Sequence, residues 1–325
     1  MIAKTFGAAC VLAAALAAPV SAQEFPSRVI TMNMPYAAGG PGDTIARLLA
    51  QGMSGPLKQQ VIVENTAGAG GSIGSAKVAG SPPDGYNLLL IHLSHATNPA
   101  LYPKLKYDPI KDYEPIGLAV DLPSAFVARK DLPATDLAGL IAHMKANKDK
   151  VNYAHAGIGS ASHLCGLLLA KETGAQPTQV AYRGAGPAMN DMMSGQVDVM
   201  CDQIVNVVSN VEGATIKGYA TTGAQRAPAL PNLPTASEAG LPGFTYTVWY
   251  GLFAPKGTPK PVIDKLVTAL NVALQDETVK TRLAALGVQP VTPERARPEA
   301  LAAHLKAEID KWTPIIKAAG VVGAQ

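Results

Sequence analysis

Apolar positions along the chain follow two spacings that alternate. Short apolar runs have the length of buried strands, and between them apolar residues recur three or four positions apart, as in amphipathic helices. The runs predict strands at 29–34, 61–64, 88–91, 151–154, 179–182 and 197–201. The longer spacing predicts helices at 43–57, 136–148, 162–173, 185–194, 259–276 and 299–318. Strands and helices that alternate in this way predict an α/β fold with mostly parallel sheets covered by helices.

The length of 325 residues favours two lobes over one core. No low-complexity linker separates the lobes, so we expect the chain to cross between them on strands, near 119–126 and 246–252. The predicted first lobe is therefore discontinuous, with residues 23–123 plus 247–325, and the second lobe spans 124–246. We expect a ligand cleft between the two lobes.

The first 22 residues have the order of a secretory signal. Lys4 precedes an apolar run at 6–18, and Val20-Ser21-Ala22 places small residues before a cut at Gln23. The run is shorter than the ~20 residues that span a bilayer, and no later stretch is long enough. We therefore predict a cleaved signal peptide and a periplasmic protein.

Composition and charge narrow the range of partners. The chain has 27 basic and 24 acidic residues, and removing Lys4 leaves 26 against 24. A charge so near zero gives no reason to expect nucleic acid or a membrane surface as a partner. Cys165 and Cys201 remain after cleavage. They either pair in an oxidising compartment or lie buried as small apolar side chains, and the sequence leaves both alternatives open.

Two glycine-rich turns, each between a strand and a helix, predict an anion site. The first contains Gly39-Gly-Pro-Gly42, and the second contains Gly157-Ile-Gly159 followed by Ser160 and Ser162. Glycine lets the backbone approach a ligand closely, and unpaired N–H groups at a helix start favour an anion. The alternatives are a plain turn and a serine N-cap. Because the turns fall in different lobes, we expect both to face one cleft.

Motifs that would indicate an enzyme are incomplete in this sequence. Gly70-Gly-Ser72-Ile-Gly74 has the spacing of a hydrolase nucleophile elbow, but the preceding strand is predicted to end at Glu64, and an elbow needs a strand directly before it. The dinucleotide pattern is also incomplete. The histidines lack metal-ligand spacing, so we expect no metal and no cofactor. We interpret His95, with Ser94, as a polar contact at the cleft mouth; a polar loop is the alternative.

Five further positions are candidates for the site. Asp202 follows a predicted strand at the edge where clefts open in parallel sheets, and Tyr182 ends the neighbouring strand. Tyr36, Trp249 and Tyr250 are candidates for an aromatic lining, although hinge packing is an alternative for the last two.

These features together resemble one family. Pro35-Tyr-Ala-Ala-Gly-Gly-Pro-Gly-Asp43, Pro83-Asp-Gly-Tyr86, Tyr182-Arg-Gly184, Gly195-Gln-Val-Asp-Val199 and Ala254-Pro-Lys-Gly-Thr-Pro259 are similar, in this order, to motifs of the tripartite tricarboxylate transporter solute receptors, the Bug family. The resemblance covers essentially the whole mature chain. Cys165, Cys201 and Gln203 depart from the pattern.

The resemblance implies a monomeric periplasmic receptor, not an enzyme, that closes two lobes around a small carboxylate and delivers it to membrane transporter subunits. A receptor that signals to a membrane partner is the main alternative, and a secreted hydrolase is a weaker one. The residues expected to bind the ligand are Tyr36, Ala37, Ala38, Gly39, Gly40, Asp43, Ser94, His95, Gly159, Ser160, Ala161, Ser162, Tyr182 and Asp202.

Overall fold

The structure, a computed structural model, describes residues 24–321, so the predicted signal peptide lies outside the described residues. The strands are β1 (Ile30–Met34), β2 (Val61–Asn65), β3 (Asn87–His92), β4 (Tyr113–Arg129), β5 (Asn152–His155), β6 (Thr178–Ala181), β7 (Val199–Gln203), β8 (Ile216–Thr221), β9 (Thr247–Pro255) and β10 (Gln289–Pro290). The α-helices are α2 (Pro41–Leu57), α3 (Ser72–Ala79), α4 (Ser94–Leu101), α5 (Leu137–Ala146), α6 (Ala161–Thr173), α7 (Ala185–Met193), α8 (Ile204–Glu212), α9 (Lys260–Gln275), α10 (Glu277–Ala285) and α11 (Pro298–Ala319).

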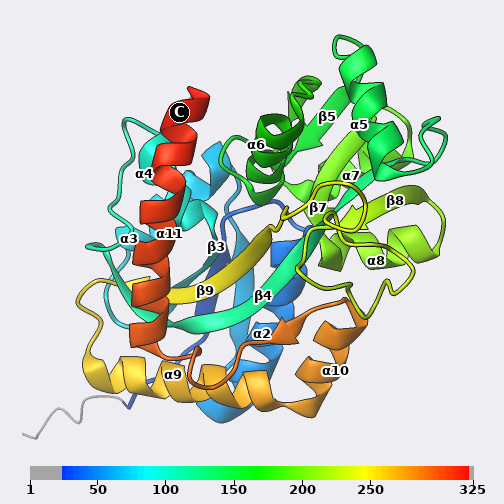
Figure 1. The fold of residues 1–325 in the computed structure, drawn as a ribbon. Coiled ribbons are helices and arrows are strands. Elements are labelled where there is room, and N and C mark those ends of the chain that lie inside the picture. Colours follow the sequence, from blue (N-terminus) through cyan, green and yellow to red (C-terminus); the bar gives the residue numbers. More distant parts are fainter. Residues whose placement is uncertain (1–23, 322–325) are drawn as a thin grey trace, which may run out of the picture.

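The strands form a mixed sheet in the order β2-β1-β3-β9-β4-β7-β5-β6, with β8 and β10 also paired to β4. Parallel pairs occupy both ends of this order, where β1 joins β2 and β3, and β5 joins β6 and β7. The central pairs, β3 with β9 and β4 with β9 and β7, are antiparallel. We call the part built around β1, β2, β3 and β9 the first lobe, and the part around β5 to β8 the second lobe (Figure 1).

The long strand β4 belongs to both lobes. It pairs with β9 as far as Pro123 and with β7 from Ser124 onward. Figure 1 shows β4 and β9 running side by side from the lower left toward the second lobe. The segment 119–126 lies within β4, and 247–252 lies within β9, so strands connect the two parts of the sheet without a linker sequence.

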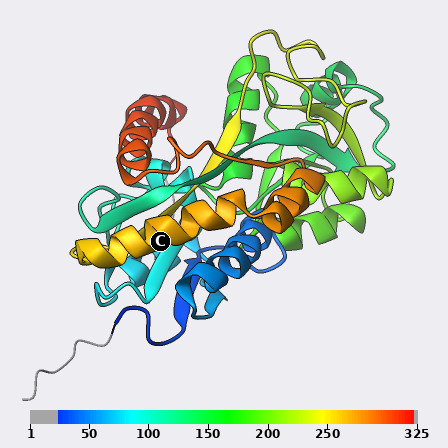
Figure 2. The ribbon, with the colours of Figure 1, turned by 90° about the horizontal axis from the view of Figure 1, so that it is seen from below.

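Segments from the two ends of the chain build the first lobe together. Helix α9 packs against α2, and α11 packs against α4 and β4. Figure 2 shows α9 lying beside the blue α2 on the same side of the sheet. The run Leu88–Ile91 in β3 is fully buried, as expected for a central strand with both faces covered.

Several elements were not predicted, and their sequences explain why. Helix α3 (SIGSAKVA) consists largely of small residues and lacks a clear apolar stripe. Helix α4 (SHATNPAL) is buried along most of its length despite its polar composition, and it contains Pro99. Helix α8 starts at Ile204, directly after the last residue of β7, so no turn signal separates the two.

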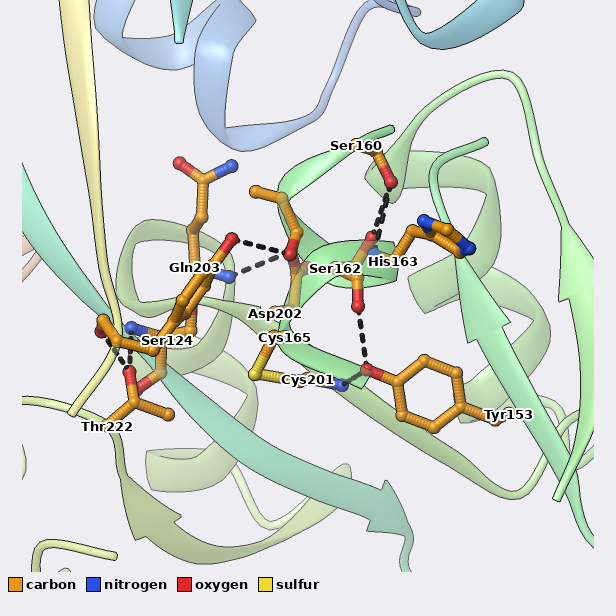
Figure 3. Close-up of a disulfide and its surroundings, with 12 residues drawn as sticks. Ser124, Tyr153, Ser160, Ser162, His163, Cys165, Cys201, Asp202, Gln203 and Thr222 are labelled. Carbon is orange, nitrogen blue, oxygen red and sulfur yellow. Dashed lines mark hydrogen bonds between the residues drawn. A yellow bond between two sulfur atoms is a disulfide. The ribbon is translucent and has the colours of Figure 1, made fainter. Parts of the chain in front are cut away.

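Cys165 and Cys201 form a disulfide, with a Cα–Cα distance of 6.1 Å. It joins the first part of α6 to β7, and Figure 3 shows it beneath Asp202. Both cysteines are fully buried. The bond settles the question that the sequence left open.

We expect the double substitution Cys165→Ala/Cys201→Ala to destabilise the protein by about 3–4 kcal/mol, because the disulfide closes a loop whose ends are 36 residues apart. Urea unfolding of the oxidised protein and the variant measures the difference. The reduced wild type is the control and should match the variant. Equal unfolding midpoints for oxidised wild type and variant would show that the bond contributes nothing.

Candidate functional site

A small cleft opens where the two lobes meet at the carboxyl ends of β1, β5 and β7. Its lining comes from both lobes. The lining residues are Met34, Tyr36, Ala37, Gly40, Pro41, Gly42, His92, Ala156, Ser160, Ala161, Ser162, Ala185, Asp202, Gln203 and Tyr250.

Helix N-termini surround this cleft. Its lining includes the N-cap or first residues of α2, α6, α7 and α8. The first N–H groups of a helix have no partner within the helix and carry partial positive charge. Within residues 24–321, none of the side chains lining the cleft is a lysine or arginine. The cleft thus favours an anion through backbone dipoles, without a cationic side chain.

Serine hydroxyls shape the start of α6. The Ser160 Oγ accepts a hydrogen bond from the N–H of His163 (3.3 Å) and lies 3.2 Å from the Ser162 Oγ. The Ser162 Oγ also accepts from the N–H of Ala156 (2.9 Å). The Tyr153 hydroxyl donates to the Ser162 carbonyl (2.7 Å) and accepts from the N–H of Cys201 (3.2 Å), which fixes α6 against β7 (Figure 3).

Asp43 organises the turn between β1 and α2. Its Oδ2 accepts hydrogen bonds from the N–H of Gly39 (3.1 Å) and the Nε of Arg47 (3.0 Å). Burial opposes the charged carboxylate, but these hydrogen bonds more than offset it and lower the pKa of Asp43. Gly39 has φ of +77°, a conformation that favours glycine. Asp43 therefore holds the turn in shape and does not itself line the cleft.

Asp202 is the acidic residue of the lining, and it is 2% exposed. Desolvation raises the pKa of Asp202 to about 7, although hydrogen bonds from Asn206 and the N–H of Gln203 act in the opposite direction. The Asn206 Nδ2 lies 2.6 Å from one carboxylate oxygen, and the N–H of Gln203 lies 2.8 Å from the other. Because its pKa is near neutrality, Asp202 can be present in the cleft without a negative charge.

The imidazole of His92 and the phenols of Tyr36 and Tyr250, all from the first lobe, form one wall of the cleft. The His92 ring stacks on Tyr36, with centroids 4.7 Å apart, and meets Tyr250 edge-on at 5.5 Å. Its Nδ1 accepts a hydrogen bond from the N–H of Ser94 (3.0 Å), and burial lowers the pKa of His92 to about 3. The neutral ring therefore carries its proton on Nε2. The Tyr250 hydroxyl donates to the Gln203 Oε1 (2.9 Å).

The structure brings together only some of the residues that the sequence nominated. Those that line the cleft are Tyr36, Ala37, Gly40, Ser160, Ala161, Ser162 and Asp202. Those that lie outside its lining are Ala38, Gly39, Asp43, Ser94, His95, Gly159 and Tyr182.

His95 and Tyr182 are the clearest departures. Helix α4 carries His95 into a fully buried cluster with Tyr107, Tyr113 and Phe253, with ring centroids 4.8–5.6 Å from its own. The Tyr182 hydroxyl instead donates to Asp191 (2.6 Å). Neither side chain is therefore available at the cleft.

Sequence reasoning missed several lining residues. Tyr250 was considered only as an aromatic candidate, whereas Trp249 next to it turns away and donates its Nε1 proton to Glu308 (3.2 Å). His92 was not nominated from the sequence, although its place at the end of β3 is a usable signal. The remaining members are Met34, Pro41, Gly42, Ala156, Ala185 and Gln203.

The enzyme-like motif has a different geometry from a nucleophile elbow. β2 ends at Asn65, and a short 3₁₀ turn at Ala69–Gly71 precedes Ser72, the first residue of α3. Over residues 24–321 no cluster of three or more histidine, cysteine, aspartate or glutamate side chains is suited to a metal ion. In the same range, no helix combines the length and apolar character needed to cross a membrane.

The two lobes touch across the cleft mouth. The N–H of Ala37 donates to the Arg183 carbonyl (3.3 Å), and the Tyr102 hydroxyl donates to the Ile158 carbonyl (2.8 Å). A Cβ added at Gly184 would lie 2.8 Å from the Ala37 Cβ and 3.0 Å from its nitrogen. The lobes are thus in contact at a point where Gly184 leaves little room for a side chain.

Comparisons with known proteins agree with this architecture. The model of the tripartite tricarboxylate transporter family receptor matches residues 45–321. The chain is 46% identical over 296 residues to a protein encoded in the TAR-I ttuE-ttuC' intergenic region of Agrobacterium vitis, covering 91% of this chain and 86% of that protein.

Solved structures are similar over nearly the whole length. The periplasmic binding protein BugD has a TM-score of 0.89 and 45% identity, covering 92% of this chain and 99% of its own. MatC from Rhodopseudomonas palustris, solved with bound malate, has a TM-score of 0.87 and 43% identity, covering 90% and 100%. The resemblance noted in the sequence is confirmed: this chain belongs to the tripartite tricarboxylate transporter receptor family and has the two-lobed α/β fold of a periplasmic binding protein.

Proposed function

We propose that this protein is a periplasmic receptor that captures a small carboxylate by lobe closure and delivers it to a tripartite tricarboxylate-type membrane transporter. The observation that carries the proposal is the set of helix N-termini around a cleft whose lining, within the described residues, has no cationic side chain. MatC, with a similar fold, binds malate, which supports the same class of ligand here.

The chemistry of the cleft favours a carboxylate. Charge-assisted hydrogen bonds from backbone N–H and serine hydroxyl groups are stronger than neutral ones, and a closed cleft excludes the water that would compete for them. Ala161, Ser162 and Ala185 lie in first helical turns at the lining and so supply such N–H groups. The carboxylate is bound and released without chemical change.

Closure and delivery follow from the same architecture. We place the lobe boundaries at residues 123/124 and 246/247, where β4 changes its pairing partner from β9 to β7 and where β9 begins. We propose that the protein acts as a monomer, and that a transporter distinguishes the closed form from the open one. Co-purification with solubilised transporter subunits tests the delivery step against a purely signalling role.

We expect at least one carboxylate to raise the melting temperature of the protein. A ligand at 100 times its dissociation constant adds about 2.7 kcal/mol to the free energy of unfolding, which is a readily visible shift. Thermal melting of residues 23–325 against mono-, di- and tricarboxylates, aromatic acids included, measures it. Neutral amides of the same acids are the control. The proposal fails if no acid shifts the melting temperature.

We expect Gly184→Ala to weaken carboxylate binding by roughly tenfold to a hundredfold, because crowding a packed contact costs about 1–3 kcal/mol. Gly184 has φ of 170°, an extended backbone that alanine adopts freely, and the three atoms nearest its added Cβ belong to Ala37 of the other lobe. The closed form is therefore destabilised selectively.

Isothermal titration measures this loss of affinity, and the melting temperature of the ligand-free variant shows whether the fold is intact. Gly80→Ala is the matched control, because the nearest atom to its added Cβ is at 3.6 Å, an ordinary contact. Unchanged affinity in Gly184→Ala would mean that the observed lobe contact is not part of the bound state.

We expect the stability of the wild type to decline relative to Asp202→Asn as pH rises from about 4 to about 7. The pKa of Asp202 is raised from 3.8 to about 7, so the folded protein retains a proton that the unfolded chain has already lost in this range. Stability conferred by that proton is complete below pH 4 and is lost by pH 7, at about 1.4 kcal/mol per pH unit.

Urea unfolding at several pH values measures the difference between the two proteins. The buried histidines His92, His155 and His163 have lowered pKa values and act in the opposite direction, but they are common to both proteins and cancel in the difference. A difference that is constant from pH 4 to 8 would contradict the raised pKa of Asp202.

A further inference from the structure

Two donors in the cleft have no partner among the described residues. The Gln203 Oε1 accepts from Tyr250, which leaves the Nε2 group with no hydrogen bond to the rest of residues 24–321. The His92 Nδ1 accepts from the N–H of Ser94, and its Nε2 is likewise unpaired within that range. Both side chains line the cleft, and the two residues are only 5% and 3% exposed.

Tyr250 contacts both of the residues that carry these donors. Its hydroxyl holds the Gln203 amide, while its ring meets the His92 ring edge-on. In Figure 3 the Gln203 side chain extends away from the sheet, toward the blue ribbon of the first lobe. An amide that is held at its oxygen is fixed in orientation, so its nitrogen is free to donate to a ligand in the cleft.

The donors determine what this part of the cleft recognises. Both acceptor atoms of the pair, Gln203 Oε1 and His92 Nδ1, are already occupied by Tyr250 and Ser94. The remaining protons are neutral donors, because burial keeps the pKa of His92 at about 3. A carboxylate or carbonyl oxygen satisfies them, whereas an ammonium group or an alkyl chain leaves them unpaired.

We propose that His92 and Gln203, both in contact with Tyr250, form a second subsite that binds an acceptor group of the ligand and selects dicarboxylates over monocarboxylates of equal length. This rests on the proposed function, since the helix N-termini bind the first carboxylate. A site built to hydrogen-bond a ligand group discriminates strongly against an analogue that lacks the group, because the buried donors are then unpaired.

The test compares dissociation constants for succinate with butyrate and for adipate with hexanoate, measured by titration calorimetry. The wild type should prefer the diacid in at least one pair by tenfold or more. Gln203→Glu keeps an acceptor for Tyr250 but replaces the donor with an acceptor, so the preference should fall at least tenfold. The added charge weakens both acids, but the diacid should lose more affinity than the monoacid because only the diacid places a group at this subsite, so the measured quantity is the ratio of the two dissociation constants.

Gln196→Glu is the matched control, because it makes the same change of charge at an exposed position of the second lobe. His92→Phe, which retains ring contacts and removes the donor, should reduce the preference in the same direction. Gln203→Met removes the amide without adding charge and replaces Gln203→Glu if that variant melts below the assay temperature.

The outcomes separate the two proposals. If wild type binds the two acids equally in both pairs, or if the variants weaken monoacid and diacid to the same extent, the subsite is overturned while carboxylate binding stands. If wild type binds none of the four acids and none of the melting panel, the proposed function fails as well.

Discussion

The unpaired N–H groups at the helix starts are the constraint around which the cleft is built. A buried helix start needs acceptors for its first N–H groups, and several helices of this protein begin at one cleft. The chain satisfies part of this need itself: Ser160 caps α6, and Asp43 accepts from the turn before α2. The rest is left to a ligand. The glycines and serines of the two turns, together with the charge of Asp43, fit a cleft that presents backbone donors without a cationic side chain.

The second lobe holds its donors in a rigid frame. The disulfide joins α6 to β7, and the Tyr153 hydroxyl links Ser162 to the N–H of Cys201. The start of α6 and the end of β7 are therefore held together. Asp202 sits in this frame, and its raised pKa reduces the repulsion that a fixed negative charge would impose on an anionic ligand. The first lobe contacts this frame through Ala37 and Tyr102.

Much of the fold was predictable because its strands and helices have strong local patterns. The run Leu88–Ile91 reads as a buried strand, and the two glycine turns identify both sides of the cleft. Helices α3 and α4 were not predictable, since their small and polar residues are buried by tertiary contacts and not by an apolar stripe. The pairing of Cys165 with Cys201 required a geometry that no sequence pattern supplies.

Only some of the nominated residues line the cleft, and His92 and His95 show the reason. They lie three residues apart, but β3 runs on to His92 while α4 begins at Ser94 and turns His95 into an aromatic core. Gln203 was missed as a lining residue because β7 runs two residues beyond the predicted end. Side-chain direction at the end of a strand depends on where the next element starts, and in this chain those starts lack turn residues.

The most direct measurement is the dissociation constant of a bound acid beside that of its carboxamide, which has nearly the same shape without the charge. If oriented backbone dipoles hold the anion, the acid binds at least about tenfold more tightly than the amide, a difference of about 1.4 kcal/mol. Equal affinity for acid and amide would contradict the account, because the helix N-termini would then contribute shape and no electrostatic recognition.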